Sequence, residues 1–129
     1  MGERYLIDTS AYSYYITRRL AAEPYLFFER IVGQESLLSV VTRIELLSWI
    51  PGNKVVEAVV RSIVNDSIVV PLSEEVILQT VRLRRHHKSV KLPDAIIAAT
   101  AMVHDFTLLS TNDSDFEKIQ GLKCQSLNA

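Results

Sequence analysis

Acidic side chains recur in this sequence beside short apolar segments. Asp8 follows the apolar run 5–7, and Asp94 opens a stretch that is otherwise almost wholly apolar. Functional residues of open parallel sheets gather at the carboxyl ends of the strands, so acids at such positions are candidates for one shared site. Carboxylate oxygens are the ligands that hard divalent cations such as Mg²⁺ and Mn²⁺ prefer. The other acids of this kind are Glu45, Asp113 and Asp115.

Each of these acids also has an ordinary structural interpretation. Asp8 is a possible helix N-cap, and Asp94 stands one residue after Pro93, where a carboxylate suits the helix dipole. Asp113 and Asp115 are possible turn and cap residues, and Glu45 is a possible surface charge. Composition and spacing alone do not show that the acids converge, so both interpretations stay open at this point.

Short apolar segments alternate with longer stretches of helical periodicity. Strands are expected at 4–7, 36–40, 67–70, 107–110 and 122–126, and helices at 9–19, 24–33, 41–50, 55–64, 74–87 and 93–103. Short strands that alternate with helices indicate parallel pairing through helical crossovers. The sequence therefore predicts an α/β protein with a short parallel sheet between two helical layers, as one domain over residues 1–129.

Composition narrows the class of protein further. The chain has 129 residues, of which 48% are hydrophobic, so it is not expected to be disordered. Its longest run without a formal charge is ten residues, too short for a transmembrane helix. Cys124 is the only cysteine, which excludes an intrachain disulfide and fits a reduced, cytoplasmic setting.

Four motifs together resemble the PIN-domain ribonucleases, and most closely the VapC-type toxins of prokaryotic toxin–antitoxin pairs. An apolar strand runs into Asp8-Thr9-Ser10, and a Thr-x-x-Glu-Leu motif ends at Glu45-Leu46. The third motif is Asp94 at the start of an alanine-rich helix. The fourth is Leu108-Leu109-Ser110-Thr111-Asn112-Asp113-Ser114-Asp115-Phe116. The motifs stand in the family's order and span residues 5–116.

The resemblance implies a metal-dependent endoribonuclease that leaves 5′-phosphate and 3′-hydroxyl ends. Asp8, Glu45, Asp94 and Asp113 would hold Mg²⁺ or Mn²⁺ and carry catalysis, because bound divalent ions activate water and handle the leaving oxygen. Family members place the fourth acid at either of two positions, and both are acidic here. Asp113 is favoured as the main ligand, with Asp115 as a helper. Thr9, Ser10, Thr111 and Asn112 are candidates for orienting waters or the phosphate, or equally for turn and cap hydrogen bonding.

A basic stretch precedes Asp94, although the net charge of the chain is −1. No acidic residue occurs from position 76 through 93, where Arg84, Arg85 and Lys88 are the candidate RNA contacts. Clustered cations are the usual footprint of phosphate binding, but they are equally favoured at a helix C-terminus by its dipole. His86 and His87 suggest a solvated pair rather than a metal site, because adjacent residues point to different helix faces.

The resemblance also implies partners. VapC-type toxins are held inactive by a cognate antitoxin protein and are usually homodimers. Tyr12, Tyr14, Tyr15, Phe27 and Phe28 are expected to divide between core and either base stacking or a groove for that antitoxin. The apolar helix 96–103 is expected to be central core or a subunit interface.

Three other functions remain to be weighed. A PIN fold kept as an RNA- or protein-binding module without catalysis is the main alternative, and the intact acidic set argues against it. Phosphatases of the haloacid-dehalogenase type need a second Asp two residues after the first, where this chain has Ser10. Receiver domains need a lysine after a late strand, where it has Asn112 and Asp113.

Overall fold

A computed structural model describes residues 2–128 and shows five short strands and seven helices in that range. The strands are β1 (Tyr5–Ile7), β2 (Leu37–Ser39), β3 (Ile68–Val70), β4 (Thr107–Ser110) and β5 (Cys124–Ser126). The helices are α1 (Thr9–Ile16), α2 (Ala22–Gln34), α3 (Val40–Ser48), α4 (Lys54–Asp66), α5 (Glu74–His86), α6 (Leu92–His104) and α7 (Asp113–Phe116).

All four strand pairings are parallel, and the strands lie in the order β3-β2-β1-β4-β5. The chain winds outward from β1 to β2 and β3, and then crosses back to place β4 on the other side of β1. β1 and β4 therefore flank the point where the winding direction reverses. In open α/β sheets, the crevice beyond the carboxyl ends of two such strands is the usual ligand site. Asp8 and Thr111 follow these two strand ends.

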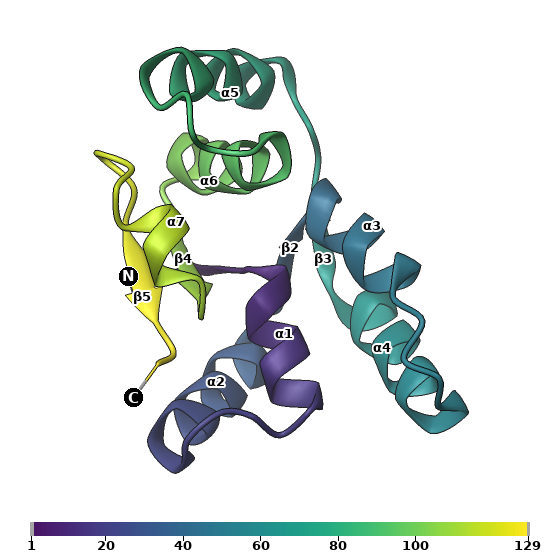
Figure 1. The fold of residues 1–129 in the computed structure, drawn as a ribbon. Helices are drawn as coiled ribbons and strands as arrows, with labels where there is room; N and C mark the ends of the chain where they lie inside the picture. The colour runs from purple at the N-terminus through teal and green to yellow at the C-terminus, as the bar shows by residue number, and fades with distance from the viewer. Residues whose placement is uncertain (1, 129) are drawn as a thin grey trace.

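Both faces of the sheet are buried under helices, as Figure 1 shows. Neighbouring strand residues point to opposite faces, so Leu6 and Leu108 pack with α5 and α6, whereas Ile7 and Leu109 pack with α1, α2 and α4. This double burial explains why the strands read as continuous apolar runs rather than as an alternation. The predicted three-layer α/β/α architecture with a short parallel sheet is confirmed.

Helix α6 is the central helix of one layer. It lies between the sheet and α5, so both of its sides are enclosed (Figure 1). The residues at positions 95 and 97–101 are all buried. Of the two interpretations of this apolar segment, core packing is therefore the one that the structure supports.

Side-chain caps define several helix boundaries. Ser73 accepts a hydrogen bond from Val76 N at the start of α5, and Asn53 accepts from Val55 N and Val56 N at the start of α4. The expected elements all occur, with ends that differ by a few residues. One element, the four-residue α7, was not expected, because a single helical turn offers no periodicity to detect.

Candidate functional site

Asp8 lies at the carboxyl end of β1, almost fully buried, with a side chain that is 4% exposed. It occupies the N-cap position of α1, yet its carboxylate makes no capping hydrogen bond. Its Oδ2 instead accepts hydrogen bonds from the hydroxyls of Ser10 (2.5 Å) and Ser110 (2.8 Å). Burial raises the pKa of Asp8, and these two hydroxyls partly oppose that rise. The carboxylate of Asp8 is therefore oriented by two hydroxyls, one from the start of α1 and one from the end of β4.

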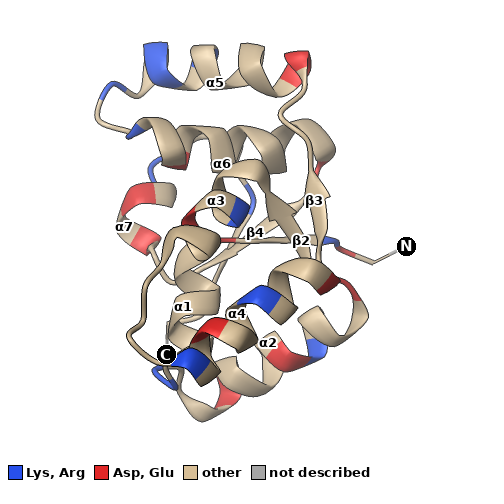
Figure 2. Cartoon of the chain, turned by 90° about the vertical axis from the view of Figure 1, so that its right-hand side faces the viewer, with Lys and Arg blue, Asp and Glu red and all other residues tan. Residues whose placement is uncertain are grey.

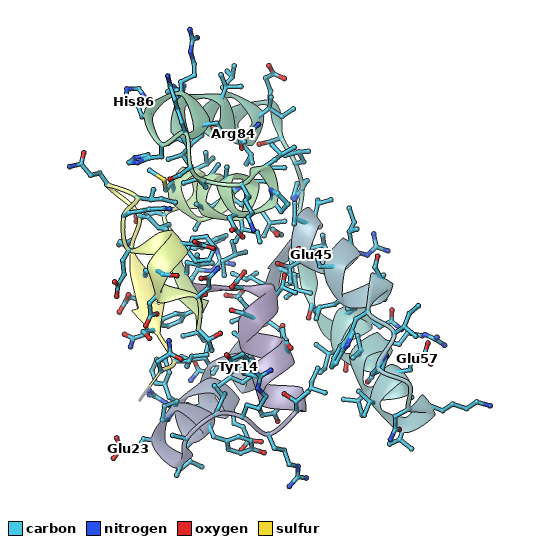
Figure 3. All side chains as sticks on the ribbon, in the orientation of Figure 1. Tyr14, Glu23, Glu45, Glu57, Arg84 and His86 are labelled. Atoms are coloured by element: carbon cyan, nitrogen blue, oxygen red, sulfur yellow. The ribbon has the colours of Figure 1, made fainter. Side chains whose placement is uncertain are left out.

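Glu45 is exposed on the second turn of α3, which begins directly after β2. Its Oε1 accepts a hydrogen bond from the Thr9 hydroxyl at 2.6 Å. The same hydroxyl lies 3.1 Å from that of Thr42, a fully buried residue. A link between α1 and α3 thus holds Glu45 toward the carboxyl end of β1, and Figure 3 shows its side chain on the inner side of α3.

Asp94 is half-buried in the first turn of α6. The pKa of Asp94 is raised to about 6, mainly by burial and also by the nearby negative charges of Asp8, Asp115 and Glu45, while Lys91 opposes the rise. Carboxylates from α3, α7 and the end of β1 therefore act on the carboxylate of α6. Figure 2 shows the acidic segments of α3, α6 and α7 on the same side of the molecule as the basic last turn of α5.

The two acids of α7 point in different directions. Asp115 Oδ2 accepts a hydrogen bond from Asn112 Nδ2 (2.9 Å), and its charge acts on Asp94. Asp113 Oδ2 accepts instead from Ser126 Oγ (2.9 Å) and Asn128 Nδ2 (2.8 Å), beside β5. Residues two apart in a helix do not share a face, so this divergence follows from α7 itself. These contacts favour Asp115, not Asp113, as the fourth acid of the cluster.

The polar residues near the strand ends mainly make hydrogen bonds with one another and with the backbone. Ser10 Oγ accepts a hydrogen bond from Thr111 N (3.2 Å), and Ser110 Oγ accepts from Asn112 N (2.9 Å). Ser110 and Thr42 are buried site residues that sequence reasoning had not singled out as functional. Both lie within the recognised motifs, but a hydroxyl inside an apolar segment gives no sequence signal of what it contacts.

The chemistry of these donors fits a hard divalent cation, because all are carboxylate oxygens and because their mutual repulsion would be relieved by a positive charge. Within residues 2–128, however, no three His, Cys, Asp or Glu side chains are oriented closely enough to hold a metal ion together. Glu45 is exposed, so its side chain can rotate without repacking the core.

The predicted RNA contacts line a groove between the end of α5 and the start of α6. Thr80, Val81 and Leu92 line this groove of about 420 Å³ together with the exposed Arg84, Arg85 and Lys88. The structure thus brings the three cations together. Figure 3 labels Arg84 between α5 and α6, and His86 at the end of α5 in the same last turn.

Most of the clustered aromatic residues belong to the core. Tyr12 and Phe28 are buried and meet edge to face, with ring centroids 5.1 Å apart. Tyr15 packs on Phe28 and Tyr25. The guanidinium of Arg19 covers the ring of Tyr14, at 4.0 Å from its centroid. Tyr12 and Phe28 therefore belong to the core, whereas Tyr15 and Phe27 are half-buried and line two surface cavities of about 480 and 610 Å³.

Exposed apolar side chains occur elsewhere, on two surfaces. The α3–α4 surface carries Ile44, Leu47, Ile50, Val55 and Val59, and the α5–α6 surface carries Leu72, Ile77, Leu78, Val81 and Leu92. No helix within residues 2–128 is long and apolar enough to cross a membrane.

Comparisons with solved structures agree with this architecture. VapBC of Salmonella typhimurium, crystallised with DNA, matches with a TM-score of 0.81 at 19% identity, covering 98% of this chain and 99% of that one. VapBC2 of Rickettsia felis, bound to a fragment of its promoter, gives 0.79 at 17% identity over 95% and 97%. A toxin–antitoxin complex from Klebsiella pneumoniae gives 0.72 at 25% identity over 95% and 97%. A search of curated proteins finds no match.

The family assignment comes from a sequence model. The model of the PIN domain matches residues 5–122, nearly the whole chain. It spans all four motifs and all five acids discussed above, and the overall fold is similar to that of the VapBC structures. The resemblance seen in the sequence is confirmed: this chain belongs to the PIN domain family.

Proposed function

We propose that this chain is a metal-dependent endoribonuclease and the toxin of a toxin–antitoxin pair. The observation that carries the proposal is the convergence of carboxylates from four separate segments. The negative charges of Asp8, Glu45 and Asp115 all raise the pKa of Asp94, beyond the strand ends where the sheet reverses its winding. Like charges gathered in this way oppose folding, so such an arrangement is expected where a cation binds.

In this proposal Asp8, Glu45, Asp94 and Asp115 hold Mg²⁺ or Mn²⁺. When bound, the ion supplies Lewis acidity toward the scissile phosphate and lowers the pKa of water. The chain's own groups orient its ligands: Ser10 and Ser110 fix Asp8, Thr9 fixes Glu45, and Asn112 fixes Asp115. This role replaces direct contact with the phosphate, which the sequence had left open for Thr9, Ser10 and Asn112.

Substrate binding is assigned to the basic end of α5. Arg84, Arg85 and Lys88 are exposed and share one groove, so they can contact successive phosphates of a single strand. Thr111, whose backbone oxygen accepts a hydrogen bond from Asn128, stays a candidate for orienting the phosphate. RNA is the proposed substrate class, in the cytoplasm.

Two partners belong to the proposal. The Klebsiella relative is a toxin–antitoxin complex, and a cognate antitoxin would find two exposed apolar surfaces here, on α3–α4 and on α5–α6. A second copy of the chain is the other expected partner. Sedimentation of the chain alone over a range of concentrations tests for a homodimer, and a monomer throughout would contradict it.

The deciding experiment is cleavage of a 5′-labelled RNA by the purified chain free of any antitoxin. We expect cutting with Mn²⁺ or Mg²⁺ and none in excess EDTA, because carboxylates alone cannot activate water beside a polyanion. The products should carry 5′-phosphate ends, which a phosphate-dependent ligation detects. Asp94→Asn serves as the matched inactive control, and undiminished cleavage in EDTA would exclude the proposed mechanism.

A second candidate is a PIN-fold module that binds RNA or protein without cutting it. It is favoured by one observation, that no three acidic side chains within residues 2–128 are close enough to hold an ion. Filter binding separates the two functions. RNA retained intact by the wild-type chain in Mn²⁺, with the same affinity for Asp94→Asn, would support the binding module.

A further inference from the structure

A clamp of side-chain hydrogen bonds ties the loop before α7 to the end of β5. Asn128 Nδ2 donates to Asp113 Oδ2 (2.8 Å) and to the backbone oxygen of Thr111 (2.8 Å). Ser126 Oγ donates to the same Asp113 oxygen (2.9 Å) and accepts from Asn128 N (3.0 Å). Leu127 N donates to Ser110 O (2.9 Å), so the two segments are joined at four successive points.

The clamped loop carries contacts of the acidic cluster on its other side. Ser110 Oγ donates to Asp8 Oδ2, and Asn112 N donates to Ser110 Oγ. Asn112 Nδ2 in turn donates to Asp115 Oδ2. A displacement of this loop would therefore move the partners of both Asp8 and Asp115.

We infer that Asp113, Ser126 and Asn128 are positioning residues that fix the 110–115 loop so that Asp115 and Asp8 face the cluster. The inference rests on the proposed function, which it deepens by changing the role of Asp113. That carboxylate anchors the loop through Oδ2, on the side of α7 away from Asp115. Removal of a group that hydrogen-bonds to a metal ligand, without contacting the metal itself, commonly lowers metal affinity by about 10- to 100-fold.

The geometry separates an anchor from a ligand through the choice of substitution. Asp113→Asn keeps an oxygen that can accept from Ser126 and Asn128, whereas Asp113→Ala removes it. If Asp113 anchors the loop, the chain should tolerate Asp113→Asn but not Asp113→Ala. If Asp113 is a metal ligand, both substitutions remove its charge, and Asp113→Asn should lose as much metal affinity as Asp115→Asn does.

Two measurements on the purified chain test the inference. The first is Mn²⁺ affinity by calorimetry, and the second is amide hydrogen exchange over residues 111–116 in EDTA, which needs neither metal nor activity. Asn128→Ala, Ser126→Ala and Asp113→Ala should each weaken Mn²⁺ binding by about 10-fold and speed exchange in this loop. Asp113→Asn and Ser126→Thr, which keep the acceptor and the hydroxyl, should stay close to the wild-type chain.

A double-mutant cycle and a neighbour provide the controls. Asn128→Ala should cost less in Asp113→Ala than in the wild-type chain, because the Asn128–Asp113 contact is already lost there and only the contact with Thr111 O remains to be broken. Gln125→Ala is the matched control, since this exposed side chain of β5 bonds only the backbone oxygen of Ser126. Thermal melts check that every variant is folded.

Three different results would contradict either the inference or the proposed function on which it rests. Loss of Mn²⁺ binding by Asp113→Asn equal to that of Asp115→Asn would make Asp113 a ligand. Unchanged affinity and exchange in Asn128→Ala and Ser126→Ala would deny the clamp any positioning role. A wild-type chain that binds no Mn²⁺ would contradict the proposed function, while the exchange data would still report on the clamp.

Discussion

At the scale of single residues, two acids of the cluster, Asp8 and Glu45, are held by hydroxyls rather than by cations. Asp8 accepts from two serines and Glu45 from one threonine. The two side-chain ion pairs found within residues 2–128 lie elsewhere, Arg4 with Glu35 and Lys123 with Asp105. Neutral donors orient a carboxylate without cancelling its charge, and so they leave it able to attract a metal ion.

The first prediction separates metal ligands from structural acids. Asp8→Asn, Glu45→Gln, Asp94→Asn and Asp115→Asn should each reduce RNA cleavage in Mn²⁺ by orders of magnitude, because a neutral amide replaces a charged ligand. Asp113→Asn should retain far more activity than Asp115→Asn. Labelled-RNA kinetics measures both effects.

Thermal melts of the same variants in EDTA provide the control. A pure capping role would lose about 1 kcal/mol or less on substitution by Asn, with cleavage unchanged. If the Asp8, Glu45 and Asp94 variants melted several degrees lower yet cut RNA normally, the acids would be structural and the nuclease proposal would fail.

At the scale of elements, the fold could be predicted from apolar segments and helical periodicity. The sequence also indicated Asp8 and Glu45 from strand ends and family motifs together, and Asp94 from its family motif. It favoured Asp113 over Asp115 as the fourth acid, whereas the contacts in the structure favour Asp115. That choice depends on α7, a single turn, and on hydrogen bonds to Ser126 and Asn128 from a strand that follows it. Long-range contacts of this kind leave no local pattern.

The aromatic residues show a second limit of prediction from sequence. Tyr12, Tyr15 and Phe28 recur at a spacing that suits either a core or a groove, and the amino-acid sequence offers no means to decide. The packing of α1 against α2 over the sheet decides it, because these rings fill the space between the two helices.

The second prediction concerns the last turn of α5. Replacing Arg84, Arg85 and Lys88 by Ala should weaken RNA binding and lower the slope of log affinity against log salt by about 2, because each lost phosphate contact releases fewer counterions. The fold should survive, since all three side chains are exposed. Filter binding between low and moderate salt measures the slope.

Lys54 and Arg61 supply the control for this experiment. Both are exposed cations of α4, on the opposite helical layer from α5 (Figure 1). Their replacement by Ala should leave the slope unchanged. Equal effects of the two sets would assign the α5 cations to general charge rather than to an RNA site.

At the scale of the whole molecule, the fold concentrates negative charge where its winding reverses. The net charge is only −1, and the basic groove of α5 offsets the acids within one side of the molecule. Burial and repulsion at the acidic cluster oppose folding, so the stability of the entire chain should depend on the charge state of that cluster.

The last prediction is the pH dependence of that stability without metal. The pKa of Asp94 is raised from 3.8 to about 6 in the folded chain, so between these values the folded state binds more protons than the unfolded state. The free energy of unfolding should therefore fall as pH rises from about 4 to 6. Because Asp94 is only half-buried, solvent screening keeps the effect below the full value of the pKa shift. The raised pKa of Asp8 acts in the same direction. Denaturant titrations in EDTA at several pH values measure the slope, and Asp94→Asn should reduce it and raise stability at pH 7. Added Mn²⁺ should stabilise the wild-type chain more at pH 7 than at pH 5, because Asp94 is mostly charged at the higher pH. A wild-type stability that rises through this range, with no response to Asp94→Asn, would show that the acids do not form one electrostatic unit.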